Sequence, residues 1–164
     1  MMIENCSVED GKKADDNVMN PPYSKKIAQI CTEDTVYTFP KGLPAFEDCR
    51  NFSLLVNENI KPFMYLKSLD REGLGFICID PFLVKTDYNV DLAAKDVSVL
   101  ELKDSADAMI LTLVTVNEDP SKTTTNLLAP IVINSENKIG QQVILSDSGN
   151  EVKYLIWSGL EGEE

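Results

Sequence analysis

The chain has 164 residues, a length that suits a single domain, and 43% of them are hydrophobic, as in ordinary soluble globular proteins. Its 15 basic and 27 acidic residues give a net charge of −12, which argues against binding to a nucleic-acid backbone and favours a basic partner or simple solubility. The sequence contains no histidine, which excludes Ser-His-Asp and Cys-His catalysis and His-ligated zinc.

The first segment of the chain, residues 1–26, is polar and carries charges of both signs, so it predicts a flexible extension. It does not resemble a secretory signal, and no apolar run in the chain approaches the roughly 20 residues of a membrane span. We therefore expect a cytoplasmic protein, and we expect it to be a monomer. No C-x-x-C motif is present, so the cysteines are expected to be free thiols, with a pair of disulfides as the alternative: Cys6, Cys31, Cys49 and Cys78.

Short apolar runs separated by turn signals fill the rest of the chain, which is typical of an all-β sandwich or barrel. The expected strands before the C-terminal hairpin are Ile27–Cys31, Val36–Phe39, Phe52–Val56, Phe63–Ser68, Gly75–Ile79 and Ala108–Val116. Proline at both ends of 40–44 predicts a rigid turn, and 45–50 predicts a short helical turn. Residues 91–95 suit another helical turn, followed by an extended piece.

The best-marked element is a β-hairpin within Thr123–Leu145. Two apolar runs, Leu127–Ile133 and Gln142–Leu145, flank the polar insert N-S-E-N-K-I-G, in which Asn137 or Gly140 could take the left-handed conformation of a turn. A last strand is expected at Glu151–Ile156. The sequence thus predicts an all-β fold, a single-domain small barrel or sandwich of about nine or ten short antiparallel strands over 27–157, followed by an acidic tail, 158–164.

Motifs that carry chemistry are scarce. There is no phosphate-binding loop and no calcium loop, and we expect no catalytic, cofactor or metal site. The acid pairs Asp87/Asp91 and Glu118/Asp119 could serve as glycosidase carboxylates, but acids in surface loops usually have no such role. Asp80, before Pro81, is better interpreted as a turn cap than as a catalytic acid.

Six acids and one lysine, Lys103, lie between Asp96 and Asp119. They form either a solvated rim or a negative patch for a basic protein. Our candidates for partner contacts in this segment are Asp104, Asp107, Glu118 and Asp119.

Four segments resemble the motifs of the flagellar assembly factor FliW family. They are F-P-K-G-L-P-A-F-E-D (Phe39 to Asp48), P-F-M-Y-L-K-S-L (Pro62 to Leu69), L-G-F-I-C-I-D-P-F (Leu74 to Phe82), and N-L-L-A-P-I-V-I-N with G-Q-Q-V-I-L (Asn126 to Leu145). The resemblance covers roughly 27–156, and the four motifs stand in the family's order. This chain departs from the family at Ala45, where the motif commonly has glycine, and in its N-terminal extension. The motif positions that we expect to be structural are Gly42, Leu43, Pro44, Phe46, Glu47, Asp80, Pro81, Asn126, Leu127, Pro130, Asn134 and Gln142.

The resemblance implies a binding protein without catalytic activity. Proteins of this family bind flagellin and the RNA-binding carbon storage regulator CsrA, and thereby relieve CsrA repression of flagellin mRNA translation by partner switching. A β-barrel export chaperone for another secreted protein is the second hypothesis. A carboxylate-based hydrolase is the third, and a nucleic-acid-binding barrel, opposed by the charge, is the fourth.

Overall fold

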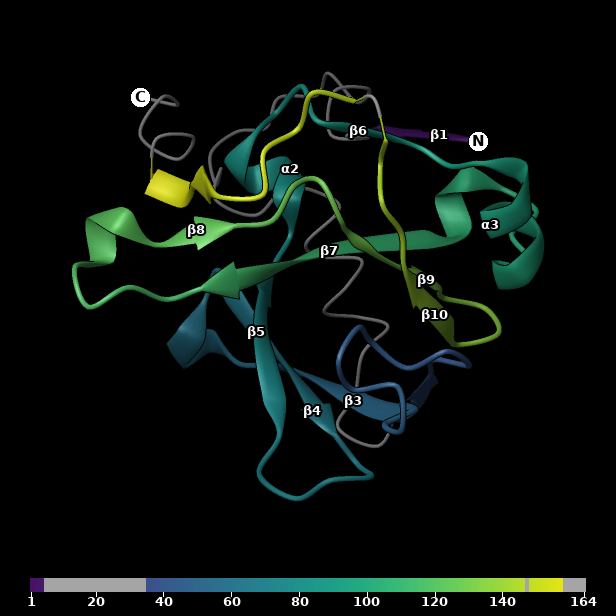
Figure 1. Cartoon of the computed structure of the whole chain (residues 1–164), viewed down its shortest axis with the longest axis horizontal. Helices are drawn as coiled ribbons and strands as arrows, with labels where there is room; N and C mark the ends of the chain where they lie inside the picture. Colours follow the sequence, from purple (N-terminus) through teal and green to yellow (C-terminus); the bar gives the residue numbers. More distant parts are fainter. Residues whose placement is uncertain (5–34, 147, 158–164) are drawn as a thin grey trace.

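The structure is a computed structural model that describes residues 1–4, 35–146 and 148–157 (Figure 1). Its strands are β1 (Met2–Glu4), β2 (Tyr37–Thr38), β3 (Asn51–Val56), β4 (Phe63–Ser68), β5 (Gly75–Ile79), β6 (Asn89–Asp91), β7 (Ala108–Thr115), β8 (Thr124–Thr125), β9 (Ile131–Asn134), β10 (Ile139–Gln142) and β11 (Tyr154–Leu155). Its helices are α2 (Pro81–Val84) and α3 (Ala94–Leu100), and its 3₁₀ turns are η2 (Glu58–Ile60), η3 (Ser105–Asp107) and η4 (Pro120–Lys122). The predicted all-β small barrel is confirmed.

Seven strands close into a barrel in the order β7, β5, β4, β3, β2, β10, β9 and back to β7. The ring closes because β7 is long enough to pair with two strands of the barrel. It pairs with β9 at its start, where Ala108–Leu111 lie opposite Asn134–Ile131, and with β5 further along. All these pairings are antiparallel except the short parallel contact between β2 and β10. That contact is the exception to the predicted antiparallel arrangement.

The barrel interior is filled by large apolar side chains that alternate along the strands, among them Phe52, Leu54 and Leu66. A smaller cluster, formed by Ile79, Val84 and Ile156, lies on the other face of β5, because Ile79 points away from its neighbour Cys78 in the main core.

β8 and β11 extend the sheet beyond the barrel at the end of β7, as the green and yellow strands in Figure 1 show. Trp157 follows β11 and packs edge-on against Phe63, with ring centroids 6.4 Å apart. Its indole nitrogen also donates a hydrogen bond of 2.6 Å to the carbonyl of Pro120. Trp157 therefore anchors the end of β11 to the β7–β8 connection.

The strands predicted at Phe63–Ser68 and Gly75–Ile79 are confirmed residue for residue, and Ala108–Val116 is confirmed one residue shorter. The predicted strand Ile27–Cys31, the remainder of the extension after residue 4, and the tail 158–164 lie outside the described residues. The strand predicted at Glu151–Ile156 is shorter and comprises only Tyr154–Leu155.

Four local predictions are wrong. Residues 45–50 form turns rather than a helical turn, and the piece after 95, predicted to be extended, is the helix α3. In the predicted hairpin, the second strand is Ile139–Gln142 rather than Gln142–Leu145, and Lys138 (φ 63°) takes the left-handed conformation, not Asn137 or Gly140. The flexible extension predicted at 1–26 is wrong for its first residues, because β1 pairs with β6 and Ile3 is buried.

Candidate partner-binding surfaces

The first family motif folds into a compact turn between β2 and β3. Gly42 has φ +64°, and a Cβ atom there would lie 2.6 Å from the Cα of Glu47, so both conformation and space require glycine. Backbone hydrogen bonds link Leu43 and Phe46 in both directions, and the carboxylate of Glu47 accepts from the amide of Ala45 at 3.2 Å. Pro44 is exposed beside Ala45, which keeps a positive φ of 76° without being glycine.

The β4–β5 connection holds this turn in place. One oxygen of Asp70 accepts from the backbone amides of Arg50 (2.7 Å) and Asn51 (2.8 Å), and these bonds lower the pKa of the Asp70 carboxyl. Arg71 donates to Asp48 at 2.9 Å, which lowers the pKa of Asp48. Asp70 and Arg71 of this connection therefore form their hydrogen bonds within the fold.

Asp80 and Pro81 begin α2. The buried carboxylate of Asp80 accepts from the amide of Phe82 at 2.9 Å, and Pro81 occupies the first helical turn, where no backbone donor is needed. This is the arrangement of a helix N-cap. The backbone of Asp80 is extended, with φ −73°, and so carries no strain from a left-handed conformation.

The last family motif is also tied internally. Asn126 accepts from the amides of Leu128 (3.0 Å) and Ala129 (3.1 Å), and Gln142 donates to the carbonyl of Ala129 at 2.9 Å. The carbonyl of the fully buried Leu127 accepts from the hydroxyl of Tyr88 at 2.7 Å.

Two further motif residues join β9 and β10 to their surroundings. The carbonyl of buried Pro130 accepts from the amide of Val143 at 3.0 Å. Asn134 donates to the carbonyls of Leu100 (2.9 Å) and Glu101 (3.2 Å) and so joins β9 to the end of α3.

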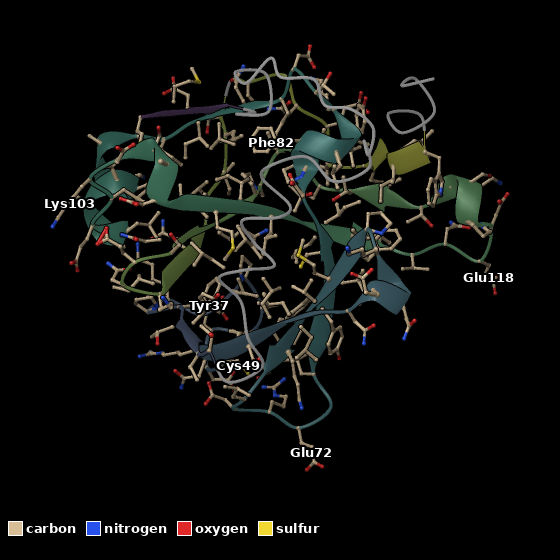
Figure 2. The ribbon with its side chains drawn as sticks, turned by 180° about the vertical axis from the view of Figure 1, so that it is seen from behind. Tyr37, Cys49, Glu72, Phe82, Lys103 and Glu118 are labelled. Atoms are coloured by element: carbon tan, nitrogen blue, oxygen red, sulfur yellow. The ribbon has the colours of Figure 1, made fainter. Side chains whose placement is uncertain are left out.

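The four acidic candidates lie at two separate ends of β7. Asp104, the N-cap of η3, and Asp107, its last residue, precede the strand, whereas Glu118 and Asp119 follow it before η4. The eight residues of β7 span roughly 26 Å at the usual rise of a strand. Figure 2 shows the same separation, with the labelled Lys103 and Glu118 at opposite ends of the molecule. The segment therefore provides two small acidic ends and not one patch.

Two of these acids also stabilise local turns. Asp104 accepts from the amide of Ala106 at 2.9 Å, and Asp119 accepts from the amide of Ser121 at 3.1 Å. Both residues are exposed, so the outer sides of their carboxylates remain accessible to a partner.

A hollow of about 790 Å³ lies between β6, the start of α3 and a segment near the C-terminus that contributes residues 143–146, Ser148 and Asn150. Its walls include Asp87, Asp91, Lys95 and Ile144, and the side chain of Ile144 is 70% exposed. We did not predict Ile144 as a surface residue. Val143, Ile144 and Leu145 are all apolar, so the sequence carries no polar–apolar alternation that marks Ile144 as exposed between its two buried neighbours.

The geometry gives little support to the hydrolase hypothesis. Asp87 and Asp91 line the hollow but are exposed, and the neighbours Glu118 and Asp119 lie on an exposed loop, so neither pair is held in an apolar pocket. Within 1–4, 35–146 and 148–157, no three carboxylate or thiol side chains come together as metal ligands would. Among the described helices, none has the length and apolar composition needed to cross a membrane.

Comparison with known proteins identifies close relatives. Residues 24–156 match the family model described as FliW protein. The flagellar assembly factor FliW of Natranaerobius thermophilus is 40% identical over 127 residues, covering 77% of this chain and 84% of the relative. The FliW of Clostridium botulinum strain Alaska E43 is 39% identical over 119 residues, covering 73% and 84%.

A solved structure has the same fold. The crystal structure of the flagellar assembly factor FliW superposes with a TM-score of 0.72 at 34% sequence identity, covering 76% of this chain and 87% of that chain. Both the match to most of the sequence and the shared barrel place the protein in one family: the chain belongs to the FliW family of flagellar assembly factors.

Proposed function

We propose that this protein regulates flagellum assembly by binding two partners in turn, flagellin and the RNA-binding regulator CsrA. Bound to CsrA, it relieves repression of flagellin mRNA translation, and newly made flagellin competes for it. The observation that carries the proposal is family membership over 24–156. In this role the protein acts in the cytoplasm, as a binding protein and not as an enzyme.

The charge of the chain supports the CsrA part of the proposal. An RNA-binding protein carries a basic surface, and a protein with net charge −12 attracts such a surface at long range. Negative potential placed beside an RNA site opposes RNA binding even where the site is not covered. This attraction weakens as salt is added, because the Debye length falls to about 8 Å at physiological ionic strength.

Calorimetric titration tests the proposal. The full chain is titrated with purified CsrA and, separately, with monomeric flagellin, each at two salt concentrations. We expect both to bind, with CsrA affinity falling as salt rises, and we expect flagellin to displace CsrA from a preformed complex. Binding to flagellin alone would instead indicate a dedicated export chaperone. Binding to neither would show that the family fold is retained without the family function.

A further inference from the structure

β1 lies at an edge of the molecule and is formed by residues outside the match to the FliW family. The family match begins at residue 24, whereas β1 comprises Met2–Glu4. β1 pairs antiparallel with β6, with Ile3 opposite Val90, and the two strands form a sheet separate from the barrel. Figure 1 shows β1 alongside β6, on the side of the molecule where α3 lies.

The contact is made by backbone and by one buried side chain. The amide of Leu92 donates to the carbonyl of Met1 at 2.8 Å, next to the β1–β6 pairs. Ile3 is only 4% exposed, whereas its neighbour Met2 is 47% exposed. Alternate residues of β1 thus face the body and the solvent, as an added strand requires.

The surface under β1 is built entirely by residues inside the family match. We define the β1 socket as the edge of β6 together with Val90, Val97 and Leu102. Val97 and Leu102 line a hollow of about 560 Å³ together with Met1, and η3 lies beside β1. Without β1, the socket would expose apolar side chains and unpaired backbone groups, which is the usual template for strand addition.

Charges around the socket are mostly negative. The elements that border β1 carry five carboxylates and two lysines: Asp91, Asp96, Glu101, Asp104 and Asp107, with Lys95 and Lys103. β1 itself, Met-Ile-Glu, has no basic side chain, and the positive charge at its start is the α-ammonium group of Met1, 3.9 Å from a carboxylate oxygen of Asp91. β1 therefore matches the socket in shape, but it places a positive charge beside only one of the five carboxylates.

We propose that the β1 socket is a strand-docking site for an extended partner segment with a β-branched aliphatic residue flanked by lysine or arginine, and that β1 is its internal competitor. The aliphatic side chain takes the place of Ile3, and the flanking bases face the acidic border. The proposal rests on the proposed function in that the segment belongs to a binding partner. It adds the location and the sequence chemistry of one contact.

Release of β1 tests the competition. Ile3→Asp places an unpaired carboxylate in the buried position and should undock the strand, whereas Met2→Asp changes the exposed neighbour and serves as the matched control. The probe is the capped peptide GSKVIVKSG, and its twin GSDVIVDSG reverses the flanking charge. Binding is followed by chemical-shift changes of the Val90 and Leu92 amides in the full chain.

We expect the basic peptide to bind Ile3→Asp about tenfold or more tightly than it binds the wild type and Met2→Asp, because only the first has a free socket. We expect the acidic twin to bind Ile3→Asp about tenfold more weakly than the basic peptide does. Ile3→Ala should give intermediate affinity, and thermal melting verifies that each variant is folded.

Equal peptide affinity for Ile3→Asp and the wild type would overturn the proposal, as would shifts confined to other surfaces or no preference between the two peptides. Titrations of wild type with CsrA and flagellin separate this result from the proposed function. If both partners bind and the peptide does not, only the docking site is refuted. If the peptide binds and neither partner does, the proposed function is refuted and the strand-accepting edge remains.

Discussion

Ala45 holds a left-handed backbone conformation, with φ 76°, at a position where glycine would be unstrained. A non-glycine residue in this conformation destabilises the folded state by roughly 1–2 kcal/mol. Glycine removes this strain, but it also raises the conformational entropy of the unfolded chain, which offsets part of the gain in stability. The side chain is exposed, so its removal loses no packing. We expect Ala45→Gly to stabilise the protein by about 1 kcal/mol, with a rise in Tm of about 2–4 °C by calorimetry.

Ala94 provides the matched control, because it is exposed but lies in the first turn of α3. Ala94→Gly should lower stability by about 0.5–1 kcal/mol, since glycine weakens a helix. A gain at both positions, or at neither, would contradict the assignment of strain to Ala45.

Asp70 illustrates a charged residue whose pKa records its role in the fold. Its folded-state pKa is lowered, first by the amide of Asn51 and then by that of Arg50, so its contribution is present above the unfolded pKa of about 3.8. The contribution is lost as pH falls through the lower folded pKa. We expect Asp70→Asn to have a lower Tm than the wild type near neutral pH, and the difference to shrink as the pH falls below about 3.8 and through the lower folded-state pKa.

Glu72 lies in the same connection, exposed at its tip, where Figure 2 labels it. At each pH from neutral to acid, Glu72→Gln should have the same Tm as the wild type. Curves of Tm against pH for the wild type, Asp70→Asn and Glu72→Gln therefore isolate the effect of the Asp70 contacts. A pH-independent deficit in Asp70→Asn would mean that geometry and not charge is responsible.

Asn134 joins three elements through one buried amide group. It donates to two carbonyls at the end of α3, and its oxygen accepts from the amide of Glu136 at 2.9 Å in the β9–β10 turn. Asn134→Ala leaves these groups unpaired, and we expect a loss of about 2–4 kcal/mol in urea unfolding. Glu136→Ala, in the same turn and exposed, leaves both bonds from Asn134 to the end of α3 in place and should cost less than about 1 kcal/mol. Similar losses in both variants would show that the turn and not the link to α3 matters.

The Asn134 link also explains why α3 could not be predicted. Within Ala94–Leu100, Val97 and Val99 alternate as in a strand, and the N-cap Ala93 makes no side-chain cap. The helix ends at Leu100, and its C-cap Glu101 has a left-handed conformation (φ 56°). Asn134, from a distant strand, donates hydrogen bonds to the carbonyls of both residues. Local pattern and tertiary contact disagree there, and the tertiary contact decides.

Gly140 shows a second limit of sequence-based prediction. It suggested a turn, but it lies within β10, and a Cβ there would be 2.7 Å from the ring of Phe39. The need for glycine comes from a neighbour about a hundred positions away in sequence. In contrast, β4 and β5 were predictable residue for residue, because their apolar runs are bounded by Pro62, Gly73 and Pro81.

At the scale of the whole molecule, barrel closure determines where charge can gather. The acids that are neighbours in sequence between 96 and 119 are split by β7, which crosses the molecule (Figure 1). The two ends are separated by roughly 26 Å, about three Debye lengths at physiological salt. A partner at one end is therefore nearly insensitive to charge at the other. The strand predicted at Ala108–Val116 already implied this separation, and the interpretation of all six acids as one patch did not take it into account.

The two acidic ends can serve as controls for each other. Asp104→Asn/Asp107→Asn and Glu118→Gln/Asp119→Asn each remove two charges, and asparagine retains the N-cap hydrogen bonds of Asp104 and Asp119. We expect the η3 pair to reduce the association rate of CsrA about 3- to 10-fold at low salt, and the η4 pair to leave it within about twofold, because η3 borders the acidic socket. Stopped-flow mixing at two salt concentrations measures both rates. Equal effects of the two pairs would indicate attraction by net charge alone, and a larger effect of the η4 pair would place the contact at the opposite end of β7.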